Sequence, residues 1–324
     1  METYVVQKKI VTVHSEDRDI SKWSTPTQFE IDLPVDYKNV VSMRLNEIDL
    51  PVPIYLFSFC DQNILLSVSV SGGTQVVVQI EEGNYTEAQM ALELTGRLNA
   101  ATSSSFVVVY DQVARKLWFT NSDPFVLIFD KGENYNASTA SYENCKKWGC
   151  STTAYYDNYA KWGLGSYLGF EKKKYTSSLG DLELYAQNTS ITNVHYVEAP
   201  FILNVKGDTN IYMELATYNN IDELMPYTEN SSDLYYAKHG GKHNSSFAKI
   251  PLRERSSRED YLANIFFSEP PLERIQKLRF KMRYHDGRPV HFHGLDFNFS
   301  IELTTLRNDH AKKFAVNKNN YALS

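Results

Sequence analysis

Two histidines close together in the sequence are the first candidates for chemistry. His291 and His293 are two positions apart, and on a strand this spacing would place both rings on one face. Zinc needs three or four ligands, so His195 or His285 would have to supply a third. The sequence selects neither of them. The pair is therefore a weak metal candidate, and exposed histidines on a polar strand face explain it without a metal.

Three cysteines occur, at positions 60, 145 and 150. Cys145 and Cys150 have the spacing C-x4-C, but Cys60 is distant and no histidine is near them in sequence, so a four-ligand zinc site is not supported. An adventitious disulfide stays an alternative. A small and odd number of cysteines is typical of proteins from a cytosol-like compartment rather than of secreted proteins with a disulfide framework.

Motifs of nucleotide-binding and hydrolytic enzymes do not occur in the chain. The segment Gly163-Leu-Gly165-Ser-Tyr-Leu-Gly169 does not sit between a β-branched strand and a helix, as a dinucleotide-binding turn must. Glycines packed against aromatic rings are the interpretation that we favour. No G-x-S-x-G, H-E-x-x-H or P-loop is present, and no spacing singles out two carboxylates. We therefore predict no enzyme, no cofactor and no small-molecule substrate.

The elements that would position these side chains are mostly strands. Every second residue from Leu295 to Leu303 is apolar, with polar residues between, which predicts a half-buried strand. Residues 280–284 also alternate and lead into Asp286-Gly287, a dipeptide typical of tight hairpin turns. Further strands are predicted at residues 5–14, 28–33, 40–50, 64–70, 75–80, 106–110, 116–120, 125–129, 201–206, 211–217, 247–252 and 263–267.

One helix interrupts the predicted strands. Thr86 followed by Gln89 is a capping box, in which each side chain bonds the other residue's backbone N–H. Apolar residues at helical spacing follow, at Met90, Leu94 and Leu98. This helix should pack on a sheet.

Two polar stretches with weak periodicity, residues 131–192 and 219–244, predict long loops, the first with a short ordered segment at residues 162–170. We thus predict an all-β fold with one or two inserted helices, namely a jelly-roll-like antiparallel β-sandwich with an α+β insertion and long loops. Two separate sandwiches are the alternative. The predicted parts are residues 1–60 together with 191–305 as the sandwich core, 61–190 as the insertion and 306–324 as a C-terminal tail.

Composition describes a globular chain with many aromatic residues. The 324 residues are 42% hydrophobic and 13% aromatic, and the formal net charge is -6. Such a charge gives no overall attraction to nucleic acid, which is not an expected partner. From residue 271 onward, however, ten Lys or Arg stand against five Asp or Glu, so one face or tail could meet an acidic partner; a solvated face is the alternative.

Several short sequence segments occur in an order that resembles the sequences of a known family. They are Ser15 to Asp19, Phe29 to Pro34, Lys38 to Pro51, Glu82 to Thr86, Leu164 to Phe170, Pro271 to Phe280, Asp286-Gly287 and Gly294 to Leu303. Together they resemble minor capsid proteins of giant, nucleocytoplasmic large DNA viruses of the chlorella-virus and mimivirus kind. His291-Phe-His293 departs from the acidic or aromatic residues that this family pattern has before the glycine.

The resemblance implies a structural role in a virion. It suggests a minor capsid protein, acting as cement or scaffold, that lies beneath or between capsomers of the major capsid protein and stabilises the icosahedral shell. The implied partners are the major capsid protein and other minor capsid proteins, with the inner viral membrane as a further candidate. The implied location is the inner side of the shell, after assembly in the host cytoplasm. The alternative is a virus-encoded carbohydrate- or receptor-binding β-sandwich module.

Residues of the N-terminal strand, the loops and the tail, most of them aromatic or basic, are the predicted contact residues, because aromatic side chains are enriched at interfaces. Local core or free surface is the alternative for each. The candidates are Tyr4, Val13, Tyr155, Tyr156, Tyr159, Tyr235, Tyr236, Lys312, Lys313 and Tyr321.

Overall fold

The chain packs into two compact units. The computed structural model describes residues 4–51, 54–135, 150, 154–184, 189–224, 243–252 and 265–308. Unit 1 comprises Met1–Pro53, Thr209–Met225 and Gly241–Ser324, and unit 2 comprises Ile54–Asp208 and Pro226–Gly240. The sequence-based division had boundaries at residues 61 and 190. Residues 54–60 and 191–208 thus lie in unit 2 rather than with the predicted core.

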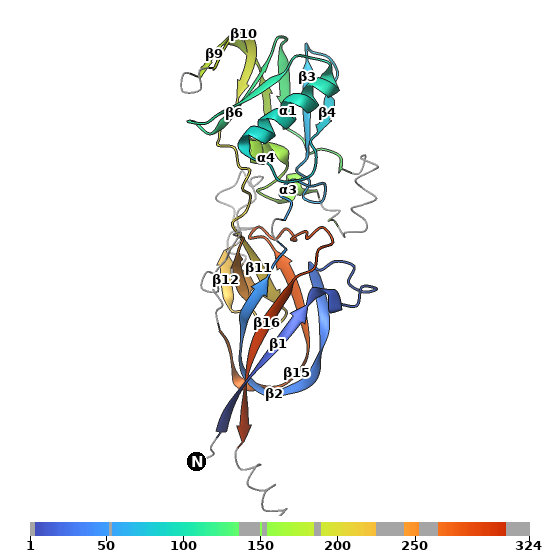
Figure 1. The fold of residues 1–324 in the computed structure, drawn as a ribbon, viewed down its shortest axis with the longest axis vertical. Coiled ribbons are helices and arrows are strands. Elements are labelled where there is room, and N and C mark those ends of the chain that lie inside the picture. Colours follow the sequence, from blue (N-terminus) through green and yellow to red (C-terminus); the bar gives the residue numbers. More distant parts are fainter. Residues whose placement is uncertain are drawn as a thin grey trace, which may run out of the picture. The chain divides into compact units, whose positions relative to one another are not determined.

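Unit 1 is built on one six-stranded antiparallel sheet in the order β1-β16-β2-β15-β11-β14. β1 pairs with β16 along its whole length, so the two ends of the described chain are neighbours in this sheet (Figure 1). A separate two-stranded sheet pairs β12 with β13. The strands are β1 (Tyr4–His14), β2 (Gln28–Asp49), β11 (Asn210–Leu215), β12 (Ile221–Leu224), β13 (His243–Ser246), β14 (Ala248–Pro251), β15 (Phe266–Arg283) and β16 (Asn298–Asn308).

The unit 1 sheet is curled into a half-barrel because its longest strands bend. The structure joins the two strands predicted at residues 28–33 and 40–50 into the single strand β2, of 22 residues. Asn39, at the bend, has a φ of 53°, a left-handed conformation that Asn tolerates better than most residues. β2 and β15 turn together there (Figure 1). The first half of β2 pairs with β15, and the second half also pairs with β16.

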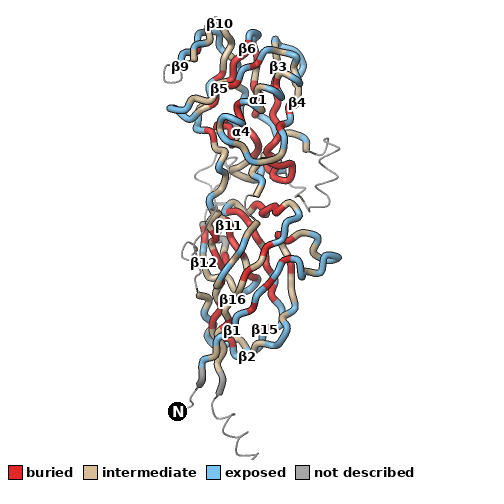
Figure 2. The backbone as a smooth tube through the Cα atoms, in the orientation of Figure 1, coloured by how far each residue is buried: buried red, intermediate tan, exposed pale blue. Residues whose placement is uncertain are grey.

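The predicted alternation near the C-terminus is confirmed. Phe297, Phe299, Ile301 and Leu303 are buried, whereas Leu295 is exposed and precedes β16. These buried residues belong to the core of unit 1, whose strands carry the buried stretches coloured red in Figure 2.

The turn at Asp286-Gly287 is confirmed, but the hairpin is not complete. Tyr284 donates its backbone N–H to the carbonyl of Arg288 at 2.8 Å, and Gly287 has a φ of 92°. The returning chain then makes only the isolated bridge between Arg283 and Pro289. β16 pairs with β1 and β2 instead of β15, because β2 lies between them in the sheet.

Unit 2 contains two four-stranded antiparallel sheets, in the orders β5-β6-β10-β9 and β4-β3-β7-β8. Its strands are β3 (Leu65–Val70), β4 (Val76–Gln79), β5 (Val107–Asp111), β6 (Lys116–Asn121), β7 (Phe125–Ile128), β8 (Lys174–Thr176), β9 (Ser178–Leu184) and β10 (Thr189–Glu198). Its helices are α1 (Glu87–Thr102), α3 (Tyr155–Asn158) and α4 (Leu164–Leu168). Unit 1 contains the short 3-10 helix Ser15–Asp17. The whole molecule is thus mostly β with few helices, as predicted.

The predicted capping box of α1 is confirmed. The Thr86 side chain accepts from the backbone of Gln89, and the Gln89 side chain accepts from the backbone of Thr86. Met90, Leu94 and Leu98 are buried in the unit 2 core. The apolar face of the helix therefore covers the sheets behind it, as the spacing predicted.

Two segments of unit 2 differ from expectation. Three strands, β8, β9 and β10, lie within or beside the predicted loop, at residues 174–176, 178–184 and 189–198. Residues 201–206, a predicted strand, are not one: Phe201 and Asn204 donate their backbone N–H groups to the carbonyls of Gly169 and Tyr167 around α4. The pairing of β8 with β7 and of β10 with β6, and the bonds of residues 201–204 to the segment around α4, involve distant parts of the chain, which local alternation does not predict.

Candidate assembly surfaces

The structure places the predicted contact residues in different environments. Val13 and Tyr155 are buried, whereas Tyr156 and Tyr159 are half-buried. Tyr4 begins β1, and its side chain is not described. The candidates Tyr235, Tyr236, Lys312, Lys313 and Tyr321 lie outside the described residues.

Val13 and Tyr155 present no side-chain surface to a partner. Val13 points to the inner face of the unit 1 sheet and is 2% exposed, while Tyr155 is 0% exposed within unit 2. The ring of Tyr155 packs edge-on against Tyr159, with centroids 4.9 Å apart. Both side chains are thus buried in apolar contacts inside their own units, which fits the interpretation as local core.

Tyr156 is held in place by its own unit. Its hydroxyl donates to the backbone carbonyl of Phe129 at 2.8 Å, and the Lys172 ammonium lies 4.8 Å from the ring centroid. Burial, with smaller effects of Asp130 and Asp157, raises the pKa of Tyr156 to about 12. It therefore stays a neutral hydrogen-bond donor at physiological pH.

A groove in unit 1 separates two open strand edges. Residues 10–14 of β1 form one wall, residues 30–34 and Tyr37 of β2 form the other, and the volume is about 510 Å³. Among the described strands, β1 pairs only with β16, and the first half of β2 pairs only with β15. Both walls therefore carry outward backbone N–H and C=O groups that can pair with an added strand.

The groove is acidic at its rim and apolar inside. Val11 and Val13 are buried, and Ile31 and Leu33 are half-buried. Lys22 lies 3.5 Å from one rim carboxylate, and Lys277 lies 3.1 Å from another. The charged lining residues are Asp17, Asp19, Glu30 and Asp32, with His14 beside them and no Lys or Arg in the described lining.

A buried ionic cluster joins three strands at one end of unit 1. Arg283 of β15 is fully buried and donates to the carboxylates of Glu214 in β11 and Glu223 in β12, the latter at 2.6 Å. It also donates to the carbonyl of Tyr284 at 3.1 Å, and His285 Nδ1 lies 3.0 Å from Glu223. Because each charge has a partner, this cluster can hold β12 against the main sheet.

The two histidines first considered do not share a strand face. His291 is buried, and His293 lies in a turn with a φ of 51°. Burial, and then the charge of Arg288, lowers the pKa of His291 to about 4. Within the described parts of the chain, no group of three or more His, Cys, Asp or Glu side chains is placed to hold a metal.

An exposed apolar patch marks unit 2. Phe201 and Ile202 are 55% and 54% exposed, and they line a hollow of about 630 Å³. Lys116, Lys161 and Asn204 also line it. Exposed apolar groups rimmed by polar side chains are typical of binding surfaces.

The glycine segment beside this hollow is structural. A Cβ atom at Gly165 would collide with the rings of Trp162 and Phe129. The prediction that these glycines pack against aromatic rings is therefore confirmed at Gly165, whereas a Cβ at Gly163 or Gly169 would meet backbone carbonyl groups.

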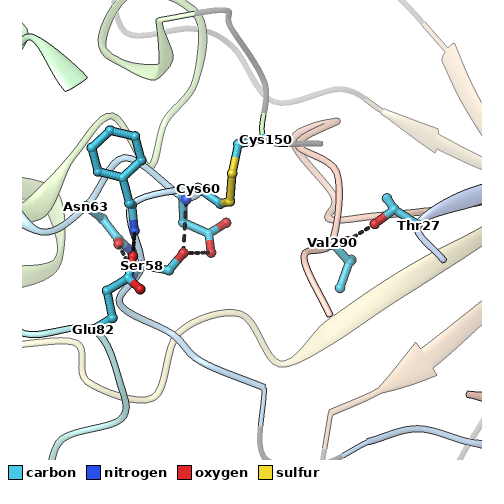
Figure 3. Close-up of a disulfide and its surroundings, with 9 residues drawn as sticks. Thr27, Ser58, Cys60, Asn63, Glu82, Cys150 and Val290 are labelled. Atoms are coloured by element: carbon cyan, nitrogen blue, oxygen red, sulfur yellow. Dashed lines mark hydrogen bonds between the residues drawn. A yellow bond between two sulfur atoms is a disulfide. The ribbon is translucent and has the colours of Figure 1, made fainter. Parts of the chain in front are cut away.

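A disulfide joins Cys60 and Cys150 (Figure 3), so the disulfide that the sequence left open as an alternative links the two cysteines most distant in sequence. Cys60 lies in a tightly bonded loop: Ser58 donates its hydroxyl to Asp61 at 2.7 Å, and its N–H to Asn63 at 2.8 Å. The sequence separation of 90 residues hid this pairing.

The sequence reasoning missed the groove, the ionic cluster and the unit 2 patch. One signal was available for the groove, since the acidic residues concentrate between positions 16 and 36. The ionic cluster carried no local signal, because Glu214, Glu223 and Arg283 lie on three different strands, β11, β12 and β15, and meet only in the folded unit.

No protein-family model matches the chain, and no curated protein matches it. Among solved structures, the crystal structure of the mavirus penton protein matches with a TM-score of 0.30 and 10% identity, covering 93% of this chain and 99% of that chain. A chain in the electron cryo-microscopy structure of the Sputnik virophage matches with a TM-score of 0.28 and 10% identity, covering 93% and 98%. Neither likeness is close enough to establish a shared fold. No helix among the described residues is long and apolar enough to cross a membrane.

Proposed function

We propose that this chain is a structural protein of a viral capsid, a minor component that binds beneath or between capsomers of the major capsid protein. It acts through protein–protein contacts and performs no catalysis. The other partners are further minor capsid proteins, and the place of action is the inner side of the shell.

One observation carries the proposal: the segments that resemble the capsid family form adjacent strands. Residues 38–51 contain the second half of β2, residues 271–280 lie in β15, and residues 294–303 contain the start of β16. β2 pairs with both of the other strands. Segments separated by more than two hundred residues in sequence thus form one continuous sheet. This supports an architecture shared with the capsid family rather than a chance resemblance of short segments.

The described surfaces fit a binding role. Unit 1 offers a long open edge with an acidic groove, and unit 2 offers an apolar patch around Phe201 and Ile202. Both are open strand or side-chain surfaces rather than enclosed catalytic clefts. A protein that links neighbours needs such surfaces on separate parts of its body.

The test is the position of the chain in purified virus particles. We expect electron cryo-microscopy to show its density repeated under the capsomers, and added protease to leave it intact until the shell is opened. The major capsid protein serves as the exposed control in the protease experiment. Density on external fibres, or cleavage in intact particles, would contradict the proposal.

A carbohydrate- or receptor-binding role is the second candidate, and the hollow beside Phe201 favours it. An exposed aromatic ring next to Lys116, Lys161 and Asn204 is the combination that stacks on and hydrogen-bonds to a sugar. Glycan-array binding that Phe201→Ala abolishes would support this role. Phe267→Ala is the matched control, because Phe267 is also exposed but lies in unit 1.

A further inference from the structure

We propose that the groove between β1 and the first half of β2 receives an extended strand from a second copy of this chain, donated by residues 311–318 of its C-terminal tail. This inference names a partner for the proposed capsid role and rests on that role only for its biological setting. The geometry of the groove, the charge of its rim and the direction of β16 support it.

The groove is a gap between two strand edges. β1 and the first half of β2 both bond a neighbour on one side only among the described strands, and their open sides line the same hollow. An inserted strand would pair with backbone groups on both walls, which is the β-augmentation mode of peptide recognition. It would also extend the half-barrel across its open side.

Strand edges are usually protected against pairing with an added strand, but the part of β1 that lines the groove is not. Natural edge strands carry Lys or Pro that discourages added strands. β1 has Lys8 and Lys9 below the groove, but the lining segment from Ile10 to His14 has no Lys, Arg or Pro. Opposite it, Pro34 is the one lining residue of β2 that lacks an N–H. The unprotected stretch therefore coincides with the groove.

The charge of the rim selects a basic donor. Asp17, Asp19, Glu30 and Asp32 line the groove, and Lys22 and Lys277 offset only part of that charge. After Asp309, the tail contains three Lys and no acidic residue. Opposite charges across such a contact favour the encounter and fix its register.

The tail also has the apolar spacing that the groove requires. Phe314 and Val316 are two positions apart, so on a strand they would share a face, with Lys313 on the other face. The inner side of the groove offers Val11, Val13, Ile31 and Leu33, and its outer side offers the carboxylates.

The direction of β16 favours a second copy as the donor. Asn308, the last residue of β16, pairs with Tyr4, whereas the groove begins at Ile10. Six strand residues span about 20 Å. The ends of β1 and β16 project together beyond the bend of β2 and β15 (Figure 1), so β16 ends pointing away from the groove of its own unit.

Cross-linking between two differently labelled full-length copies tests the proposal. In a Cys145→Ser background, a tagged acceptor carries Thr12→Cys, an outer lining residue of the groove, and an untagged donor carries Val316→Cys. We expect a short bismaleimide to yield the mixed dimer. The matched control replaces Thr12→Cys by Leu92→Cys, which lies on the exposed face of α1 in unit 2.

Charge reversal tests whether the rim recognises the donor. Glu30→Lys with Asp32→Lys in the acceptor should lower the mixed-dimer yield about fivefold, as expected for loss of about 1 kcal/mol of ion pairing. Lys312→Glu with Lys313→Glu in the donor should restore it. If the reversed acceptor melts at a lower temperature than the parent, Glu30→Gln with Asp32→Asn replaces it, and the yield should still fall.

Three results would overturn the proposal. The first is a mixed-dimer yield no higher than that of the Leu92→Cys control. The second is a mixed-dimer yield that neither charge reversal changes. The third is cross-linking only within single chains when one chain carries both cysteines. The last would assign the groove to the chain's own tail. Because purified protein is used, none of these results depends on where the chain lies in a virus particle.

Discussion

At the scale of single residues, Arg283 is a fully buried charge in unit 1. Its guanidinium is 1% exposed and bonds two carboxylates, of which Glu223 is 6% exposed. Removing one partner of a buried ion pair leaves the other charge buried without compensation.

We expect Arg283→Met to lower the free energy of unfolding by about 3 to 5 kcal/mol. Arg274→Met is the control, because Arg274 pairs with Asp36 at the surface, where solvent screens the ion pair and the loss should be small. Urea unfolding of both variants measures the difference. Equal losses would mean that the buried cluster does not stabilise unit 1.

His291 should make stability depend on pH. Its pKa is about 4 in the folded state and 6.5 ordinarily, so between these values the unfolded state binds the proton more readily. The stability present at neutral pH is therefore lost as pH falls from about 6.5 towards 4, by about 2 kcal/mol at pH 5.

His291→Phe removes the proton-binding group and should flatten this part of the pH profile. His14→Gln, a change at an exposed histidine, should leave the profile unchanged. The measurement is the urea midpoint at pH 7, 6 and 5. A profile of His291→Phe that follows the parent protein would show that another group causes the loss.

At the scale of elements, α1 depends on its N-terminal cap. Thr86→Ala should cost unit 2 about 1 kcal/mol, because the N–H of Gln89 loses its acceptor. Thr86→Ser keeps a hydroxyl and should retain most of the stability. Thermal unfolding of the two variants distinguishes a cap from a mere packing role, in which both substitutions would cost the same.

The disulfide should stabilise unit 2 through the loop that it closes. Bonding two cysteines 90 residues apart restricts the unfolded chain, which corresponds to about 4.6 kcal/mol in the entropic account. Cys60→Ser should therefore lower the urea midpoint, and Cys145→Ser should not. Peptide mapping without reductant should recover the linked pair; free thiols at both positions would contradict it.

Local patterns predicted local elements well. The cap at Thr86 and the alternation from Phe297 to Leu303 depend on neighbours in sequence, and both are confirmed. The strands β8 and β10 pair with the distant strands β7 and β6, although β10 also forms a hairpin with β9. Such pairing leaves a weak trace in composition, which is why those residues read as loop.

The surfaces were harder to predict than the elements. Val13 and Tyr155 were chosen for type and position, but burial is decided by which face of a sheet or helix a residue occupies in the packed unit. The acidic groove combines residues from β1, β2 and the turn between them. Only the curl of the sheet brings these walls together.

At the scale of the whole molecule, the division into two units predicts separable unfolding. Thr86 lies in unit 2, whereas Arg283 lies in unit 1. We expect calorimetry to show two transitions, one shifted by Thr86→Ala and the other by Arg283→Met. A single transition that both variants shift alike would mean that the units unfold together.

The order in which strands leave the ribosome has a consequence for unit 1. β2 cannot complete its sheet until β16 exists, and their partners Asp49 and Asn298 are 249 residues apart in sequence. At 5 to 20 residues per second, translation leaves β1 and β2 waiting on the order of 12 to 50 s. Residues 54–208 of unit 2 emerge within that interval and can fold first. During this interval the nascent N-terminal strands expose unpaired edges, which could associate with other nascent chains. We therefore expect chaperones to bind β1 and β2 until β16 has been synthesised.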